Sequence, residues 1–197
     1  MPRREAAGES ALTGKLVRLR PLRRADHKIS VAWRNDPAIR DNIMGYRFPV
    51  TAEMEADWVE RVLKDQSRTR LVLAIEDLRD RALVGFVYLS DIDWISRVAE
   101  FGILIGDTSR HGKGLGHEAL ALIVAHAFGV LDLQRLFLRV AAYNRPAIRL
   151  YRRFGFVDEG RLRHHVIHGN RRHDVLLMGL LRGEFTGTMR ARAPIHN

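Results

Sequence analysis

The feature that most constrains the fold of this chain is a short glycine-rich loop, SRHGKGLGHEAL, at residues 109–120. An apolar run at 97–107, too short for a helix, precedes the loop, and a helical pattern over about 114–130 follows it. Glycine lets the main chain approach a ligand closely, and the free N–H groups at the start of a helix stabilise an anion. The loop therefore predicts a phosphate-binding site between a strand and a helix.

The spacing of the glycines distinguishes among the known kinds of phosphate-binding loop. They stand at Gly112, Gly114 and Gly116. A Walker A loop needs a hydroxyl residue after its lysine, but Lys113 is followed by glycine. A dinucleotide loop needs glycine where this chain has His117, so that interpretation is weak. A plain turn would need one glycine only. The pattern favours a loop that wraps a pyrophosphate with backbone N–H groups, to which Arg110 and Lys113 add charge.

Strand and helix patterns alternate along the rest of the chain. The predicted strands span 15–22, 69–77, 79–93, 97–107, 133–143 and the two halves of 156–181, which meet at a Gly-Asn turn at 169–170. The predicted helices span 23–36, 51–66, 114–130 and 144–155, with N-caps at Thr51 and Asn144. This order predicts an α/β fold with a mixed sheet and helices on both faces.

The length of 197 residues fits a single domain. We expect a disordered lead at 1–13, one domain at 14–185 and a polar tail at 186–197. The start lacks the apolar stretch of a signal peptide, and no apolar run approaches the roughly 18 residues of a membrane helix. We therefore expect a cytoplasmic protein with no membrane partner.

Cysteine is absent and basic residues are in excess. Without cysteine the chain can form neither a disulfide nor a thiolate metal site nor an acyl-cysteine intermediate. The formal net charge is +10, and ten arginines between 135 and 172 accompany only Asp158 and Glu159. Such a surface attracts nucleic acid or a phosphorylated small molecule. Because no recognition helix or RNA-binding aromatic pattern is present, a nucleic-acid-binding module is only a remote alternative.

A second pattern lies downstream of the glycine loop, in VAAYNRPAIRLYRRFGF at 140–156. It reads N-x-x-A-x-x-L-Y-x-x-x-G-F and consists of Asn144, Ala147, Leu150, Tyr151, Gly155 and Phe156. Together with the glycine loop it resembles the GNAT superfamily of acetyl-CoA-dependent N-acetyltransferases. The chain is similar to the branch that acts on ribosomal-protein alanine, spermidine and nucleotide-linked amino sugars. The resemblance implies a GNAT-like mixed, mostly antiparallel central sheet.

The resemblance also implies a set of cofactor-binding residues. The family writes its loop [QR]-x-x-G-x-[GA], and His111 stands where glutamine or arginine is usual. Strand residues 103–105 then offer backbone groups to the pantetheine arm, and Asn144 either caps its helix or contacts that arm. The expected acetyl-CoA-binding residues are Ile103, Leu104, Ile105, Arg110, His111, Gly112, Lys113, Gly114, Leu115, Gly116, Asn144 and Arg149. No metal is expected.

The implied reaction is direct attack by a primary amine on the thioester in a ternary complex, because no cysteine can carry the acyl group. Tyr151 stands at the family's tyrosine position and is expected to protonate the departing sulfur, although helix spacing alone would make it a core residue. Glu100 is the candidate base, against the alternative of a surface acid on an edge strand. His164, His165 and His168 are alternative bases. They do not predict a metal site, because on a strand the side chains of His165 and His168 point to opposite faces.

The acceptor follows less directly from the sequence. We expect a protein N-terminal amine of the ribosomal-protein-alanine type, with a nucleotide-linked amino sugar or a polyamine as the alternative. A polyamine would need an acidic pocket, and the basic chain suits a nucleotide-linked amino sugar better. Candidates for the acceptor pocket are the aromatic residues Trp33, Tyr46, Phe48, Trp58 and Trp94. The expected partners are this amine acceptor and acetyl-CoA, with homodimerisation as an open question.

Overall fold

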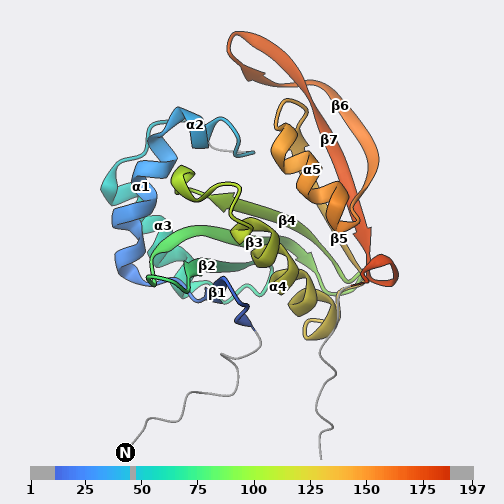
Figure 1. Ribbon diagram of the computed structural model, residues 1–197, viewed down its shortest axis with the longest axis horizontal. Coiled ribbons are helices and arrows are strands. Elements are labelled where there is room, and N and C mark those ends of the chain that lie inside the picture. Colours follow the sequence, from blue (N-terminus) through green and yellow to red (C-terminus); the bar gives the residue numbers. More distant parts are fainter. Residues whose placement is uncertain (1–11, 45–47, 187–197) are drawn as a thin grey trace, which may run out of the picture.

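A seven-stranded sheet with the strand order β1-β2-β3-β4-β5-β7-β6 forms the centre of the protein (Figure 1). The computed structural model describes residues 12–44 and 48–186. The strands are β1 (Val17–Arg20), β2 (Leu71–Asp77), β3 (Leu83–Asp93), β4 (Val98–Ile105), β5 (Arg135–Ala141), β6 (Val157–His168) and β7 (Arg171–Leu181). All neighbouring strands pair antiparallel except β4 and β5, which pair parallel. The predicted mixed, mostly antiparallel sheet is therefore confirmed.

Helices cover both faces of this sheet, as predicted (Figure 1). They are α1 (His27–Asn35), α2 (Pro37–Arg40), α3 (Ala52–Lys64), α4 (Leu115–Gly129) and α5 (Arg145–Phe154). Both predicted N-caps are confirmed, since the Thr51 hydroxyl accepts a hydrogen bond from the Met54 N–H (3.2 Å) and the Asn144 side chain accepts one from the Ala147 N–H (3.3 Å). Each cap satisfies an N–H group that has no partner within its helix.

The helix predicted at 23–36 ends just before Pro37. The first helix ends at Asn35, and Pro37 opens the short helix α2. Proline suits the first helical position because its missing N–H would have no partner there, and the Asp36 carboxylate caps the same turn by accepting from the Ala38 N–H (2.9 Å). A second, short helix therefore begins almost immediately after the first helix ends.

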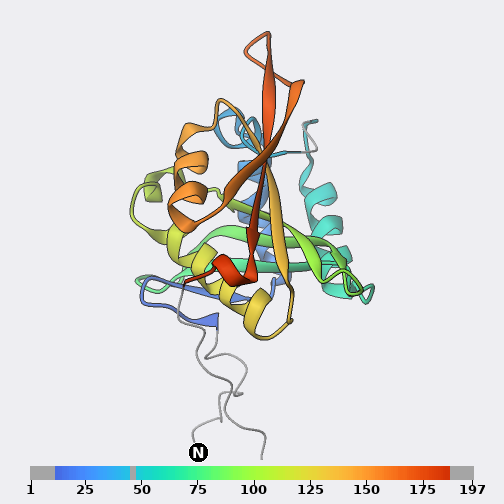
Figure 2. The ribbon, with the colours of Figure 1, turned by 90° about the vertical axis from the view of Figure 1, so that its right-hand side faces the viewer.

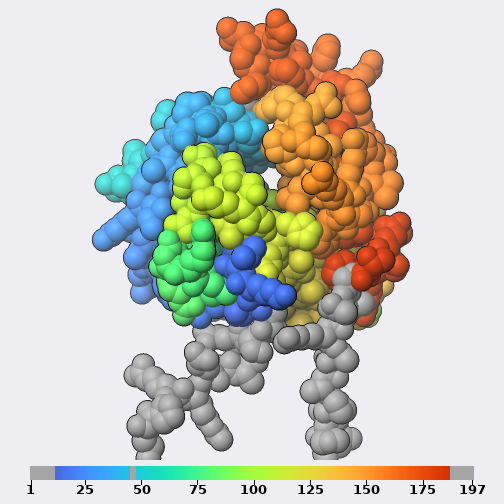
Figure 3. All heavy atoms as spheres, in the orientation of Figure 1, coloured from blue at the N-terminus to red at the C-terminus, as the bar shows by residue number. Residues whose placement is uncertain are grey.

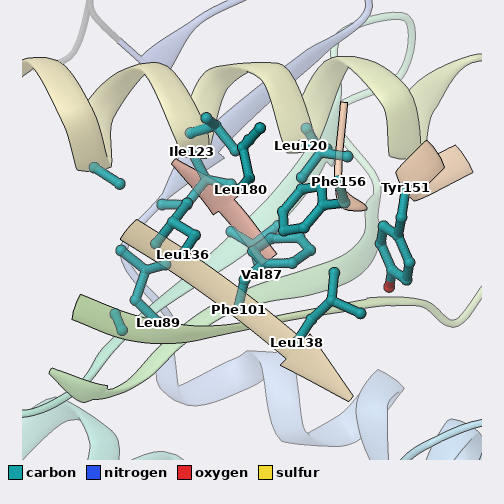
Figure 4. Close-up of a cluster of buried hydrophobic side chains, with 14 of the residues drawn as sticks. Val87, Leu89, Phe101, Leu120, Ile123, Leu136, Leu138, Tyr151, Phe156 and Leu180 are labelled. Carbon is teal, nitrogen blue, oxygen red and sulfur yellow. The ribbon is translucent and has the colours of Figure 1, made fainter. Parts of the chain in front are cut away.

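The sheet separates two apolar clusters. The larger cluster lies between the sheet and helices α4 and α5, with Phe101 and Phe156 at its centre (Figure 4). The smaller one lies between the sheet and helices α1 and α3, around Phe86 and Trp33. Successive side chains of a strand point to opposite faces, so residues at odd positions of β4 such as Phe101 face the first cluster and Leu104 faces the second. This alternation decides which face each site residue reaches.

The glycine-loop helix α4 also holds the first strand. The Glu118 carboxylate accepts hydrogen bonds from the N–H groups of Lys15 (2.8 Å), Leu16 (2.6 Å) and Val17 (2.8 Å). Within the predicted lead, Thr13 pairs with Arg18 in an isolated bridge, so ordered backbone begins before residue 14. Residues 1–11 of the lead and all of the predicted tail except Thr186 lie outside the described residues.

Strands β6 and β7 form a long hairpin that rises beyond the body of the sheet (Figure 2). Its turn residues Gly169 (φ 54°) and Asn170 (φ 60°) both have positive φ, as a two-residue hairpin loop with the twist of the sheet requires. The predicted Gly-Asn turn is therefore confirmed. Near the turn, the ring of His168 stacks on Tyr143 with centroids 4.5 Å apart and approaches the Asp41 carboxylate (3.3 Å).

Candidate active site

The two central strands separate part of the way along the sheet. Strands β4 and β5 pair only from Val98 with Arg135 to Glu100 with Phe137, although each strand continues for several residues. A cleft of about 930 Å³ opens beyond this point. In the space-filling view it is a hollow between the loop after β4, helix α5 and the segment around α2 (Figure 3). Separation of the strands exposes main-chain groups that a continuous sheet would hide.

Backbone groups of β4 line one edge of this cleft. The Gly106 N–H donates to the Val84 carbonyl (2.9 Å), which fixes the alternation of the antiparallel ladder between β3 and β4. By that alternation Leu104 bonds to β3, whereas the N–H and C=O groups of Ile103 and Ile105 point to the opposite edge, where β5 has moved away. Of the three predicted strand residues, Ile103 and Ile105 thus present free main-chain edges, and Leu104 does not.

The glycine loop closes one end of the cleft, and its glycines differ in what they require. Gly112 (φ 73°) and Gly114 (φ 83°) have left-handed backbones that other residues adopt with strain. Gly114 is also the N-cap of α4, so the first N–H groups of that helix open beside the loop. Gly116 lies within α4, and a methyl group there would meet the Ile105 side chain at an ordinary 3.6 Å. Neither backbone strain nor crowding by the described residues therefore requires glycine at 116.

Arg110 has a different role from the predicted one. Its guanidinium donates to Asp77 (2.6 Å), Asp80 (2.7 Å) and Asp107 (2.8 Å), so each nitrogen is engaged. Hydrogen bonds to Asp80, Asp107 and Asp77 raise the pKa of Arg110 above its usual value. These carboxylates anchor the loop to the turn between β2 and β3. The arrangement does not support a phosphate contact by this side chain.

His111 connects the loop to the open edge of β4. Its Nε2 lies 2.9 Å from the Ile105 carbonyl oxygen and donates to it in the corresponding tautomer. The side chain therefore occupies one main-chain acceptor of the edge and fixes the loop relative to the strand. Lys113 is exposed and is absent from the cleft lining, whereas Arg149 of α5 lines the cleft and is exposed.

Tyr151 lies where the cleft meets the larger apolar cluster. Its ring packs edge-on against Phe101 (centroids 6.2 Å apart) and beside Phe156 (5.8 Å), and its hydroxyl lies at the end of the ring away from α5 (Figure 4). No hydrogen bond from this hydroxyl is found within 12–44 and 48–186. Burial raises the pKa of the Tyr151 phenol well above its usual value. Tyr151 is thus both a core residue and a proton-bearing group at the cleft.

Glu100 stands at the last paired position before the strands separate. Its carboxylate accepts from Arg139 Nε (2.7 Å) and from the second guanidinium nitrogen (3.0 Å), and this bond raises the pKa of Arg139. The ion pair joins β4 to β5 at the base of the cleft. Because both carboxylate oxygens already accept hydrogen bonds, the structure favours a positioning role for Glu100 over the predicted role as base.

The opposite side of the cleft is formed by side chains. Phe86 and Tyr88 of β3 and Leu104 of β4 pack in the cluster that faces α1 and α3. In the same ladder Tyr88 lies opposite Gly102, and Ser90 lies opposite Glu100. Helices and the segment before β2 add Arg34, Trp58 and Arg70. Among these residues, sequence analysis had singled out only Glu100 and Trp58. The others carry no motif, because they come from four separate segments that only the fold brings together.

The predicted aromatic residues do not form one pocket. Trp58 lines the cleft, whereas Trp33 is buried, with its indole against Gly106. Trp94 donates its indole N–H to the Arg68 carbonyl (2.8 Å), away from the cleft, and Phe48 is exposed. Tyr46 lies outside the described residues. Of the candidates that the structure describes, Trp58 lines the cleft and Trp33, Phe48 and Trp94 do not.

The predicted alternative bases lie on strand β6, away from the cleft lining. His164 and His165 are exposed, and His168 packs on Tyr143 as described above. In the part of the chain that the structure describes, no group of three or more His, Cys, Asp or Glu side chains is placed to hold a metal ion. Within the same residues, no helix is long and apolar enough to cross a membrane.

Comparison with known proteins relates this geometry to a family. The acetyltransferase (GNAT) domain family matches residues 17–157. Spermidine N(1)-acetyltransferase of Escherichia coli (strain K12) is 36% identical over 151 residues, which cover 75% of this chain and 76% of that protein. The ribosomal N-acetyltransferase-like protein YdaF of Bacillus subtilis is 31% identical over 110 residues, or 56% of this chain and 60% of that protein.

A solved structure shares the architecture as well. The crystal structure of spermidine N-acetyltransferase from Vibrio cholerae, in complex with CoA and spermine, superposes with a TM-score of 0.78 at 27% identity. The match covers 87% of this chain and 98% of that one. With the family match over 17–157 and the open edge beside a glycine loop, it shows that this chain belongs to the GNAT family of acetyl-CoA-dependent N-acetyltransferases.

Proposed function

We propose that this enzyme acetylates the primary amine of a small molecule in the cleft between β4 and β5. The observation that carries the proposal is the gap itself, which joins a face with open main-chain edges and a glycine loop to a face lined by side chains. In a direct reaction the amine and the thioester have to come together, and a gap through the sheet lets each substrate reach it from its own face. The gap between β4 and β5 is lined by residues from both faces of the sheet.

The cofactor side is assigned to α4, α5 and the open edge of β4. The N–H groups of the glycine loop and of the first turn of α4 would hold the pyrophosphate, because a helix N-terminus favours an anion. The main-chain groups of Ile103 and the N–H of Ile105 would align the pantetheine arm in the manner of an added strand, while the Ile105 carbonyl is engaged by His111. Arg149, exposed on α5 within the lining, is available to a further phosphate.

Acetyl-CoA supplies an acetyl group already activated as a thioester. The residues of this chain orient the two substrates and manage the proton at the departing sulfur. Tyr151 is assigned that task because its phenol lines the cleft and its raised pKa keeps the proton on the oxygen at neutral pH. Because the chain has no cysteine, an acyl-cysteine intermediate is excluded, and direct transfer is the mechanism that we assign.

The acceptor is proposed to be a small amine and not the N-terminus of a ribosomal protein. The relative named for spermidine is 36% identical over 75% of this chain, whereas the ribosomal relative is 31% identical over 56% of it, and the solved structure that covers 87% of the chain is also named for spermidine. Spermidine is thereby the first acceptor to assay, and amines of other charge belong in the same panel. The cytoplasmic location and the homodimer stay predictions.

Two measurements test this function. Acetyl-CoA at a hundredfold excess over its Kd should raise the free energy of unfolding by roughly 2.7 kcal/mol, seen as a higher Tm. Release of the CoA thiol is then followed with spermidine, amino sugars and a ribosomal N-terminal peptide, and the protein has no thiol of its own to add background. Acetylation of the peptide alone would overturn the small-amine acceptor, and a Tm unmoved by millimolar acetyl-CoA would overturn the site.

A further inference from the structure

We propose that the acceptor carries a carboxylate or phosphate as well as its amine, and that Arg34 and Arg70 bind that anionic group. The inference rests on the proposed function, because it assigns a substrate class to the same cleft. It concerns the side of the sheet that faces α1 and α3, where the acceptor would enter. The inference is based on the arginine side chains that line the cleft on that side.

Positive charge exceeds negative charge among the cleft residues on the acceptor side. Arg34 of α1, Arg139 of β5 and Arg70, just before β2, line it. In the lining formed by the described residues, Glu100 is the one carboxylate, and both of its oxygens accept from Arg139. Two guanidinium groups are thus left without a carboxylate in the cleft. A polyamine would bring further positive charge against them, which like-charge repulsion opposes.

Arg34 is held only loosely by its nearest acid. Its Nε lies 3.7 Å from a Glu55 oxygen, beyond hydrogen-bond distance, and its side chain is 23% exposed. The buried Glu55 carboxylate accepts a shorter bond from the Ser30 hydroxyl (2.6 Å). Among the described residues the Arg34 guanidinium thus has this long ion pair and no hydrogen bond, so its fork of N–H groups is available to a ligand. Such a fork matches the two oxygens of a carboxylate or phosphate.

Arg70 has no carboxylate within ion-pair distance among the described residues. It immediately precedes β2, and the alternation of that strand places it on the same face as Val72, which packs in the α1–α3 cluster. It is exposed and lines the cleft together with Arg34. Two cations from separate elements therefore border the same space, with Tyr88 and Trp58 between the helices and the sheet.

These arginines are separate from the groups assigned to the cofactor phosphates. Arg149 and Arg153 extend from α5, which packs on the opposite face of the sheet from α1 and α3. Phosphates held at α4 and α5 would leave Arg70 without an ion-pair partner and Arg34 with only its long contact to Glu55. An anionic group on the acceptor compensates them and at the same time orients the amine toward the gap.

The test compares acceptors that differ by one acidic group, in the full-length enzyme with saturating acetyl-CoA. Glucosamine 6-phosphate is paired with glucosamine, and alanine with alaninamide, so that the two pairs distinguish a phosphate from a carboxylate. Spermidine is the polycation. At least one acidic acceptor should exceed its neutral partner in kcat/KM by about tenfold or more, the gain expected for a charge-assisted hydrogen bond, and should exceed spermidine. This advantage should shrink as salt is added.

Variants assign the effect to the two arginines. Arg70→Gln should lower kcat/KM for the preferred acidic acceptor by about tenfold while leaving that for its neutral partner, and the Tm shift with acetyl-CoA, unchanged. Arg70→Glu should raise kcat/KM for spermidine. Arg34→Lys keeps a positive charge beside Glu55 but removes the planar fork, and should raise KM for the acidic acceptor. Arg163→Gln, on exposed β6 outside the cleft, is the matched control and should change nothing.

The outcomes separate this inference from the proposed function. Spermidine acetylated better than every acidic amine, or equal loss for acidic and neutral acceptors in Arg70→Gln, would overturn the anionic acceptor and leave the small-amine function standing. Thiol release with none of the amines, despite a normal Tm shift with acetyl-CoA, would overturn the small-amine function and this inference with it.

Discussion

The two sides of the cleft differ in the chemical groups that they present. The side formed by α4, α5 and the open edge of β4 presents mainly main-chain N–H and C=O groups, at Ile103, Ile105 and the start of α4. The side that faces α1 and α3 presents side chains, chiefly those of Arg34, Arg70 and Trp58. Main-chain groups suit a ligand that is the same in every member of a family. Side chains can change between members while the backbone stays the same, so they suit the ligand that differs.

Tyr151, which lies between the two sides, should give the largest effect. Tyr151→Phe removes the hydroxyl but keeps the ring contacts with Phe101 and Phe156, so the fold should persist. Loss of a proton donor is expected to lower kcat by roughly 10²–10⁴-fold, with little change in the Kd of acetyl-CoA. Single-turnover rates and calorimetric titration would measure the two quantities. Near-normal turnover would remove Tyr151 from the reaction and leave it as a core residue.

A change of backbone on the cofactor side should affect acetyl-CoA alone. Gly114→Ala forces a side chain into a left-handed conformation (φ 83°) at the N-cap of α4, at a cost of about 1–2 kcal/mol if the backbone is to stay in place. If the backbone moves to avoid this strain, the Kd of acetyl-CoA should rise by roughly tenfold.

Gly169→Ala is the matched control for that prediction. Gly169 also has positive φ (54°), but it lies in the hairpin turn, far from the glycine loop in sequence and outside the cleft lining. This variant should lower the Tm without changing the Kd of acetyl-CoA. If both variants weaken acetyl-CoA binding equally, the loop geometry is not what binds the cofactor.

One methyl group on each side can separate the two binding functions. A methyl at Gly116 would meet Ile105 at 3.6 Å, and one at Gly102 would meet Tyr88 at 3.5 Å, both ordinary contact distances. Neither glycine has a positive φ, so Gly116→Ala and Gly102→Ala should both fold. We expect Gly116→Ala to raise the Kd of acetyl-CoA and Gly102→Ala to raise the KM of the acceptor, each by about fivefold, because a few ångströms of space are lost. If Gly116→Ala instead raised the KM of the acceptor and Gly102→Ala raised the Kd of acetyl-CoA, the two substrates would have to be assigned to the opposite sides of the cleft.

The smallest expected effect is the response of kcat to alkaline pH. Burial disfavours the phenolate and raises the pKa of Tyr151, so its proton should be retained beyond the usual pKa of about 10. At saturating substrates, kcat should therefore fall by less than about twofold between pH 7 and pH 10. A descending limb centred below pH 9 in the wild type that is absent from Tyr151→Phe would contradict this placement of the proton.

Much of the cofactor side could be predicted from the sequence, because its determinants are local. The positive φ of Gly112 and Gly114, the cap at Asn144 and the turn at Gly155 each depend on a few consecutive residues. For Arg110 the sequence predicted a place at the loop but not the acidic partners of the side chain. Its side chain lies at the loop, but three acids that include Asp77 and Asp80 from the preceding turn engage it.

The acceptor side could not be predicted in the same way. Trp33 and Trp58 lie in neighbouring helices, yet one packs against Gly106 and the other lines the cleft. Arg34 and Arg70 are separated by 36 positions and belong to no pattern, and Glu100 meets Arg139 only because β4 and β5 pair there. Each of these contacts joins residues from separate segments, so no local sequence pattern predicts it.

The sequence by itself therefore determined the element order, the glycine loop, the helix caps and the candidate tyrosine. The tertiary structure alone decided where β4 and β5 separate, which main-chain edges of β4 become free, and which arginines share the acceptor side. The physical reason is the range of the interactions. Backbone conformation and capping depend on near neighbours along the chain, whereas the shape and charge of a cleft depend on side chains that strand pairing and helix packing bring together from distant positions.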